Sequence, residues 1–274
     1  MDNIRKAYAD ASVGQVHYRY VEANNGIPIV FFHRAPATSI SFVPIMELMA
    51  GERPLYAFDG PGFGNSFDPP EDTTMENFGR WMLEAMDDIG IDEFHIFAHH
   101  SGTHYGTEMA AICPSRIKSL MLNGIAYLTS KERVEQASKV KKPVIPDATG
   151  EYLASTCKMI QILFPEFDPD LVHNEMIGAL QSHFSRHKSF RAIWKQDYPS
   201  ILAKVSCPVL ATCAENEVWR FCFERVFRDR PDAKRVILGP SKFCTPELDA
   251  HRTVDVIREF LAEVEGASKA RTQK

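Results

Sequence analysis

The sequence has no long apolar run. Its longest stretch of apolar character extends only from Ile27 to Phe32, whereas a helix needs about 20 apolar residues to cross a bilayer. A charged segment followed by an apolar one, which would direct secretion, is absent from the N-terminal end. We therefore expect a cytoplasmic protein without a membrane partner.

The sequence is also poor in clustered cysteine and in charge of one sign. Its six cysteines have neither metal-site nor disulfide-framework spacing, so we expect a reducing compartment. The formal net charge is −5 without long runs of one sign, which argues against nucleic acid as a partner. A length of 274 residues, 45% of them hydrophobic, suits one large α/β domain with or without an inserted subdomain.

Short apolar runs alternate with amphipathic helical patterns along most of the chain. Runs that are apolar throughout are typical of strands buried on both faces of a parallel sheet. The predicted strands cover residues 16–21, 27–32, 55–58, 94–98, 119–122, 208–213 and 235–238, and the predicted helices cover 42–49, 75–89, 102–112 and 249–264. This order predicts a mostly parallel sheet with right-handed crossovers.

The pattern changes between residues 127 and 202. Helical segments separated by prolines replace the buried strands there. We therefore expect a core made of residues 1–126 and 203–274, with residues 127–202 inserted as a helical cap over the carboxyl edge of the sheet.

A predicted strand runs directly into a turn and a helix at Ala98-His99-His100-Ser101-Gly102. A sharp turn of this kind, with a side chain exposed at its apex, needs small residues two positions before and two after the apex. Ala98 and Gly102 meet this requirement if His100 is the apex, whereas an apex at Ser101 would have bulky residues on both sides. The spacing therefore predicts His100 at the apex.

Four motifs in this order resemble those of the α/β-hydrolase superfamily, in particular its members with an inserted cap. They are an oxyanion-type loop, an Asp-x-Pro-Gly-x-Gly-x-Ser loop, the strand-to-helix elbow and a strand that ends in acidic residues, at His33–Pro36, Asp59–Ser66, Ala98–Gly102 and Pro208–Glu217. The resemblance implies an α/β-hydrolase fold, with a mostly parallel central sheet flanked by helices, and an enzyme without a cofactor.

The same resemblance reveals departures from the superfamily's usual catalytic set. His100 stands at the position of the serine nucleophile, and Lys242 stands where the catalytic histidine usually precedes the last helix. The acid maps onto Glu217, with Glu215 as a close competitor. The implied catalytic set is therefore His100, Glu217 and Lys242, with Ser101 beside them.

Each of these side chains has more than one interpretation. Imidazole can take up a proton near neutral pH without a second base, so we favour His100 as a general base over a nucleophile. The N–H groups of Ser101 and Ala35 are the implied oxyanion donors, and the Ser101 hydroxyl is a less favoured nucleophile. Arg34, which replaces the loop's usual glycine, either contacts an anionic substrate group or points to solvent. Lys242 either stabilises an anion, with the acid as an ion-pair partner, or is an exposed loop residue.

A metal site is a weaker interpretation of the histidines near the elbow. His100 and His104 lie one helical turn apart with His99 alongside, but no third ligand of known spacing follows, and the resemblance implies no metal. We expect His104 to pack within its helix.

The expected function is hydrolysis of a small carbonyl- or ester-containing compound, with His100 removing a proton from water. Removal of a proton from a substrate carbon would instead give a lyase, a decarboxylase or an isomerase. A non-catalytic member that only binds a small molecule is the third alternative. A small molecule is the expected partner in every case, and the choice between a monomer and a homodimer stays open.

Overall fold

A mostly parallel sheet forms the centre of the protein, as the order of apolar runs predicts. The computed structural model describes residues 3–140, 143–163 and 169–272, and these contain a sheet of eight strands in the order β1-β2-β4-β3-β5-β6-β7-β8. The strands are β1 (Arg5–Ala11), β2 (Gly14–Val21), β3 (Ile29–Phe32), β4 (Leu55–Phe58), β5 (Phe94–His99), β6 (Ile117–Asn123), β7 (Val209–Ala214) and β8 (Lys234–Leu238). Strand β2 pairs antiparallel with β1 and β4, and the other neighbours are parallel.

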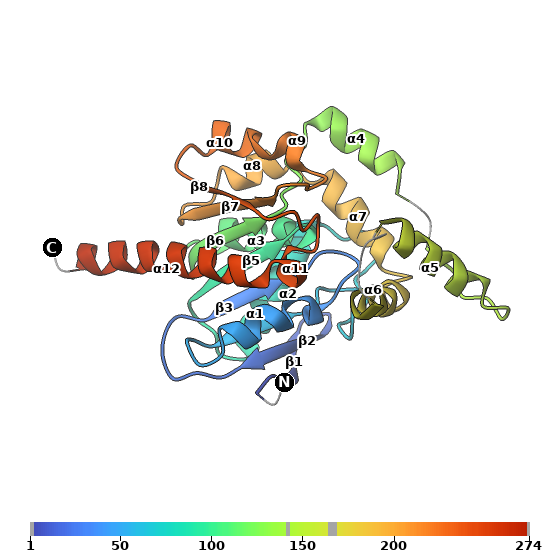
Figure 1. Ribbon diagram of the computed structural model, residues 1–274, viewed down its shortest axis with the longest axis horizontal. Helices are drawn as coiled ribbons and strands as arrows, with labels where there is room; N and C mark the ends of the chain where they lie inside the picture. Colours follow the sequence, from blue (N-terminus) through green and yellow to red (C-terminus); the bar gives the residue numbers. More distant parts are fainter. Residues whose placement is uncertain (1–2, 141–142, 164–168, 273–274) are drawn as a thin grey trace.

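Helices cover both faces of this sheet (Figure 1). One face packs against α1 (Val43–Leu48) and α12 (Ala250–Thr272), and the other against α2 (Met75–Asp88) and α3 (Ser101–Ile112). Successive β5 side chains alternate between the two layers: Phe97 belongs to the first and Ala98 to the second. Because helices bury both faces of the sheet, both sets of alternating side chains in these strands are apolar.

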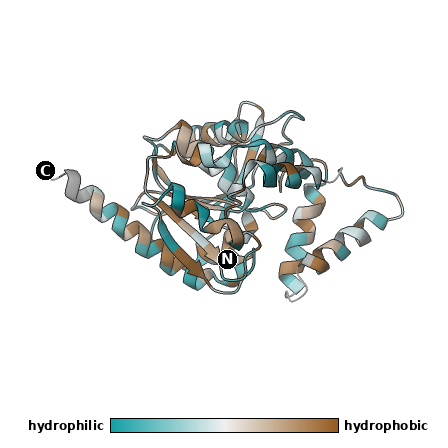
Figure 2. Ribbon diagram, turned by 90° about the horizontal axis from the view of Figure 1, so that it is seen from above, coloured by the Kyte–Doolittle hydropathy of each residue, from teal (hydrophilic) through white to brown (hydrophobic). Residues whose placement is uncertain are grey.

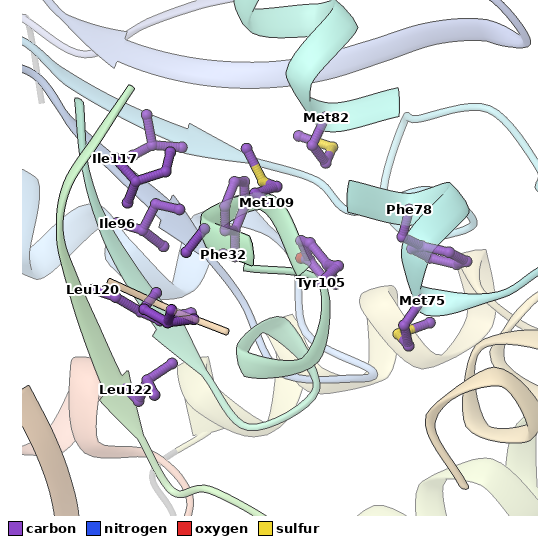
Figure 3. Close-up of a cluster of buried hydrophobic side chains, with 14 of the residues drawn as sticks. Phe32, Met75, Phe78, Met82, Ile96, Tyr105, Met109, Ile117, Leu120 and Leu122 are labelled. Atoms are coloured by element: carbon purple, nitrogen blue, oxygen red, sulfur yellow. The ribbon is translucent and has the colours of Figure 1, made fainter. Parts of the chain in front are cut away.

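The layer between α2, α3 and the sheet is the larger core (Figure 3). Tyr105 and Met109 of α3 face Phe32 and Ile96 of the strands, with Phe78 of α2 alongside. Each such side chain, when fully buried, stabilises the fold by roughly 1.5–3 kcal/mol. This packing holds the first turn of α3, and the residues just before it, against the carboxyl ends of the central strands.

Among the described residues between β6 and β7, all the regular secondary structure is helical, in agreement with the predicted helical segment. They are α4 (Ser130–Ser138), α5 (Glu151–Leu163), α6 (Pro169–Gln181), α7 (Arg186–Lys195) and α8 (Tyr198–Leu202); residues 141–142 and 164–168 of the predicted cap lie outside the described residues. Figures 1 and 2 show α5 and α6 together at one end of the molecule, extending beyond the sheet. Across the described chain, no helix combines the length and apolarity needed to pass through a bilayer.

Several elements were not predicted. Strand β1 has a mostly exposed surface in which Ala9 is the one fully buried residue, so it lacks the apolar run that identifies the inner strands. Near the site, the short helices α9 (Arg220–Phe223), α10 (Arg225–Asp229) and α11 (Thr245–Leu248) and the 3₁₀ turn η1 (Ser39–Phe42) also appear. Each is too short to show helical periodicity.

Candidate active site

His100 forms a strained turn between β5 and α3. Its backbone has φ +47° and ψ −111°, a conformation that L residues rarely adopt and that concentrates at functional sites. The His100 N–H donates to the Asn123 carbonyl at 2.9 Å, and the His100 carbonyl accepts from Thr103 N–H, also at 2.9 Å. Gly102 is required beside it, because a Cβ there would overlap the Phe32 carbonyl oxygen. The small-residue rule thus has a steric cause at Gly102.

The turn directs the His100 ring toward a buried carboxylate. His100 Nε2 lies 2.9 Å from Glu217 Oε2, and the Glu217 side chain is 0% exposed. Glu217 follows β7 in the chain, whereas the competing Glu215 is exposed to solvent. The structure therefore brings Glu217, and not Glu215, to His100.

Gly124 makes room for this contact. Its φ is +68°, and a Cβ built on it would lie 2.5 Å from His100 Cδ2, 2.6 Å from Nε2 and 3.2 Å from Glu217 Oε2. The Cδ2–Nε2 edge of the ring therefore faces Gly124, and Nδ1 is the ring atom opposite that edge. Sequence reasoning missed Gly124, although a glycine directly after a buried strand is a signal of close approach.

His100 lies at the wall of a cavity of about 300 Å³. Most of the lining side chains are apolar or aromatic, and the described residues that line it are Arg34, Ala35, Pro36, His100, Ser101, His104, Ala126, Phe190, Ile193, Trp194, Val218, Trp219 and Phe243. The cavity thus brings together four of the predicted residues, from two loops and the start of α3, with residues of α7 and of the segment after β7. A second cavity, of about 650 Å³, shares none of these residues.

Ser101 and Ala35 contact each other in this cavity. The Ala35 N–H donates to Ser101 Oγ at 2.6 Å. This N–H was predicted to donate to an oxyanion, and it already has an acceptor in the Ser101 hydroxyl. The Ser101 N–H is in the first turn of α3, where the helix itself supplies no acceptor. The backbone of Ser101 therefore remains the better-placed donor of the two.

Comparison with known proteins agrees with this architecture. A family model described as alpha/beta hydrolase fold matches residues 27–157. The enol-lactonase from Burkholderia xenovorans LB400 superimposes with a TM-score of 0.75 at 18% identity, over 93% of this chain and 100% of that one. A hydrolase from Pseudomonas aeruginosa PA01 superimposes with a TM-score of 0.78 at 18% identity, over 94% and 98%. The chain has the alpha/beta hydrolase fold.

Two sequence relatives match parts of the chain at low identity. A proline iminopeptidase from Heyndrickxia coagulans is 26% identical over 141 residues, which is 50% of this chain and 49% of that relative. A haloalkane dehalogenase from Agrobacterium fabrum is 28% identical over 196 residues, or 69% of this chain and 62% of that relative. The matched regions therefore span 49% and 62% of the length of these two relatives.

Within this alpha/beta hydrolase fold, Arg34 has a role that the sequence did not predict. Its side chain is only 2% exposed, so the alternative in which Arg34 points to solvent is wrong. Arg34 Nη2 lies 2.7 Å from Glu175 Oε1 of α6 and 3.1 Å from Glu247 Oε1 of α11, and Nε donates to the Phe243 carbonyl at 2.6 Å. Burial raises the pKa of Glu247, against the effect of Arg34. The positive charge of Arg34, which one alternative assigned to a substrate anion, thus already interacts with the carboxylates of Glu175 and Glu247.

Lys242 lies beside the cavity and does not line it. Its backbone has φ +50°, and its N–H donates to Asn216 Oδ1 at 2.7 Å. The next residue, Phe243, lines the cavity instead, with its ring 6.1 Å from the His100 ring, centroid to centroid. The half-buried Lys242 is therefore near the site, and its predicted charge role stays a prediction.

The neighbouring histidines have different surroundings. His99 is buried, and neither of its ring nitrogens has a hydrogen-bond partner among the described residues; burial, with the nearby His100, lowers its pKa well below the usual value. His104, expected to pack within its helix, reaches Gln196 and lines the cavity. In the part of the chain that the structure describes, no group of three side chains is arranged to hold a metal ion.

The Asp-x-Pro-Gly-x-Gly-x-Ser loop has a structural role. Asp59 is buried and accepts hydrogen bonds from the Ser39 N–H at 2.7 Å and the Asn65 N–H at 3.1 Å, with His17 Nδ1 at 2.8 Å. Burial alone raises the pKa of Asp59, but the contact with His17 and the proximity of His33 outweigh it and lower the pKa to about 2. Asp59 of this motif therefore holds together the segments that contain His17, Ser39 and Asn65.

Proposed function

We propose that the protein is a cofactor-free hydrolase of a small carbonyl- or ester-containing compound, with His100 as general base. The observation that carries the proposal is the contact between His100, at a strained turn that lines a cavity, and the buried Glu217 carboxylate. In this proposal residues 127–202 are a cap over a core of residues 1–126 and 203–274. The activities that name the iminopeptidase, the dehalogenase and the enol-lactonase favour hydrolysis of small molecules.

The proposed base has a defined tautomer. A carboxylate can only accept a hydrogen bond, so the proton of a neutral His100 ring lies on Nε2, toward Glu217 at 2.9 Å. The lone pair then lies on Nδ1, opposite the ring edge that faces Gly124. Glu217 holds the ring in this orientation and stabilises the imidazolium formed after proton uptake, as the acid of a hydrolytic triad does.

The hydrolytic steps follow from this arrangement. Nδ1 takes a proton from water while the water oxygen forms a bond to the substrate carbonyl carbon, and the carbonyl oxygen becomes an anion. The Ser101 N–H stabilises this anion, assisted by the positive end of α3. When the carbonyl re-forms, the bond to the leaving group breaks and the imidazolium returns its proton to that group. Lys242 adds positive charge near the site in this scheme.

Hydrolysis of p-nitrophenyl acetate and p-nitrophenyl butyrate tests the assignment. We expect His100→Ala to lower kcat/KM by a factor of roughly 10²–10⁴, the usual contribution of a general base, and Glu217→Gln to lower it in the same direction. Ser101→Ala keeps the backbone N–H and should change the rate little. Loss of activity in Ser101→Ala with full activity in His100→Ala would assign the reaction to the serine hydroxyl and contradict the proposal.

The second candidate is proton removal from a substrate carbon by the same base. One observation favours it: Ser101 Oγ already accepts from the Ala35 N–H, so this N–H is not available to a substrate anion. An enolate needs fewer hydrogen-bond donors than the full alkoxide charge formed in hydrolysis, because its charge is shared between oxygen and carbon. Incubation of ketones and 1,3-dicarbonyl compounds in D₂O separates the two. His100-dependent deuterium uptake without hydrolysis would support the carbon-acid reaction. If neither reaction occurs but a small molecule binds, the protein is a non-catalytic member.

A further inference from the structure

A second imidazole lines the same cavity. His104 belongs to α3 and lies one helical turn after His100. It is only 3% exposed and lines the cavity together with Trp194. Its Nδ1 lies 2.6 Å from Gln196 Oε1. The described residues supply no hydrogen bond to its other ring nitrogen, Nε2.

The partners of Gln196 determine which nitrogen of His104 has the proton. Gln196 Nε2 donates to the His104 carbonyl at 3.2 Å and to Glu108 Oε1 at 2.6 Å. A backbone carbonyl can only accept, so the atom that faces it must be the amide nitrogen, and the atom that faces His104 Nδ1 must be the amide oxygen. That oxygen also only accepts, and Nδ1 therefore holds the proton. Nε2 is left with a lone pair.

His104 is also held in its neutral form. Burial lowers its pKa to about 4, although the hydrogen bond to Gln196 acts in the opposite direction. A neutral ring with its proton on Nδ1 can accept a hydrogen bond at Nε2 and cannot donate one there. The cavity thus contains a fixed acceptor, independent of the base at His100.

The other walls of the cavity are largely aromatic. Phe190 and Trp194 are stacked with an interplanar angle of 10° and centroids 6.3 Å apart, and Trp194 meets Trp219 at 62° with centroids 6.0 Å apart. Flat apolar compounds fit such walls, because aromatic rings gain from stacked and edge-to-face contacts. A hydrogen-bond donor on a compound bound there would find an acceptor in His104.

We propose that His104 Nε2 accepts a hydrogen bond from a hydroxyl or N–H group on a planar, largely apolar substrate, and thereby determines which compounds the site takes. The inference concerns the cavity of the proposed function and rests on it for the reaction that follows binding. The physical reason for selectivity is that a compound without the donor would leave a buried acceptor unpaired. Charged compounds are not the expected class, since the charge of Arg34 is already matched by Glu175 and Glu247.

A matched pair of ligands tests the acceptor. 2-Naphthol and 2-fluoronaphthalene have the same rings and nearly the same size, but only the first has a donor. Titration calorimetry on the full chain should give a higher affinity for 2-naphthol, by roughly tenfold or more, the usual range for a buried hydrogen bond. In His104→Phe we expect the ratio of the two affinities to fall by about the same factor, and comparing ratios between variants cancels the different hydration of the two compounds.

His100→Ala is the matched control in the same cavity. It should lower the rate of the proposed catalysis strongly and keep the preference for 2-naphthol. Equal affinities in the wild-type protein, or a preference lost in His100→Ala and kept in His104→Phe, would overturn the inference. A wild-type protein that prefers 2-naphthol but hydrolyses no ester would instead contradict the proposed function alone.

A measurement on the wild-type protein covers the case in which His104→Phe does not fold. With ¹⁵N-labelled histidine, we expect the Nε2 resonance of His104 to be that of an unprotonated nitrogen and to shift when 2-naphthol is added, but not with 2-fluoronaphthalene. A protonated Nε2 with a bare Nδ1, or a resonance that ignores 2-naphthol while it binds, would refute the assignment.

Discussion

Gly124→Ala offers a sharp test of the geometry around His100. The added Cβ would lie 2.5 Å from His100 Cδ2 and 2.6 Å from Nε2, whereas non-bonded heavy atoms normally approach to about 3.5–4.0 Å. Because the Gly124 backbone lies in the left-handed region, at φ +68°, alanine is strained there even without a neighbour. Both effects act in the same direction and must be separated by a control.

Gly90→Ala is that control. Gly90 has nearly the same φ, +72°, and a Cβ there would meet nothing within 4 Å. It should therefore cost only the left-handed strain of a non-glycine residue, about 1–2 kcal/mol. Gly124→Ala must in addition turn the His100 ring away from Glu217, losing a hydrogen bond to a charged group, a further ~1.5–3 kcal/mol. We expect a total loss of about 2.5–5 kcal/mol in the free energy of unfolding, measured with urea.

A double-mutant cycle with His100→Ala isolates the steric part. Without the imidazole, the closest remaining neighbour of the methyl group added at position 124 is Glu217 Oε2, at 3.2 Å, so Gly124→Ala in this background should cost little more than Gly90→Ala does. The interaction energy between the two substitutions should be about 2 kcal/mol, within the range known for residues in contact.

The cycle can fail in a definite way. If Gly124→Ala costs the same in the presence and absence of the His100 ring, the ring does not lie against Gly124, and its contact with Glu217 is not the one described. This outcome does not depend on any assumed substrate, since unfolding is the measured quantity.

Three further predictions concern the surroundings of the cavity. Arg34→Met leaves the buried carboxylates of Glu175 and Glu247 without their shared guanidinium, and we expect unfolding in urea to be easier by roughly 3–5 kcal/mol; a change under about 1 kcal/mol would contradict this account. The pKa of His104 falls from 6.5 to about 4 on folding, so below pH 6.5 the unfolded chain binds a proton that the native state refuses. Stability should fall as the pH drops from 6.5 toward 4, by at most about 3 kcal/mol from this group, and the fall should be smaller in His104→Asn; an identical pH profile would argue against the burial. Gly178→Ala would drive a Cβ into the Pro36 carbonyl oxygen, so we expect faster proteolysis within α5 and α6, and unchanged cleavage would show that α6 does not press on that loop.

Much of the fold follows from local pattern. The inner strands are apolar throughout because helices cover both faces of the sheet, and this is visible in segments such as Ile29–Phe32. The elbow can also be predicted from neighbouring residues, because only a small residue fits at Gly102, close to the Phe32 carbonyl. By contrast, β1 at the edge of the sheet has little buried surface to leave a pattern.

The partners of the site residues depend on segments far apart in the chain. Glu215 is a close competitor of Glu217 in the sequence, and only the turn after β7 buries one of them against His100, 117 positions away. Arg34 meets Glu175 across 141 positions, and Gln196, beyond α7, sets the proton of His104. Periodicity reports which face of an element is buried, because that depends on neighbours within a few residues. Which buried polar groups meet depends on how the elements pack, and here that was decided by the tertiary structure alone.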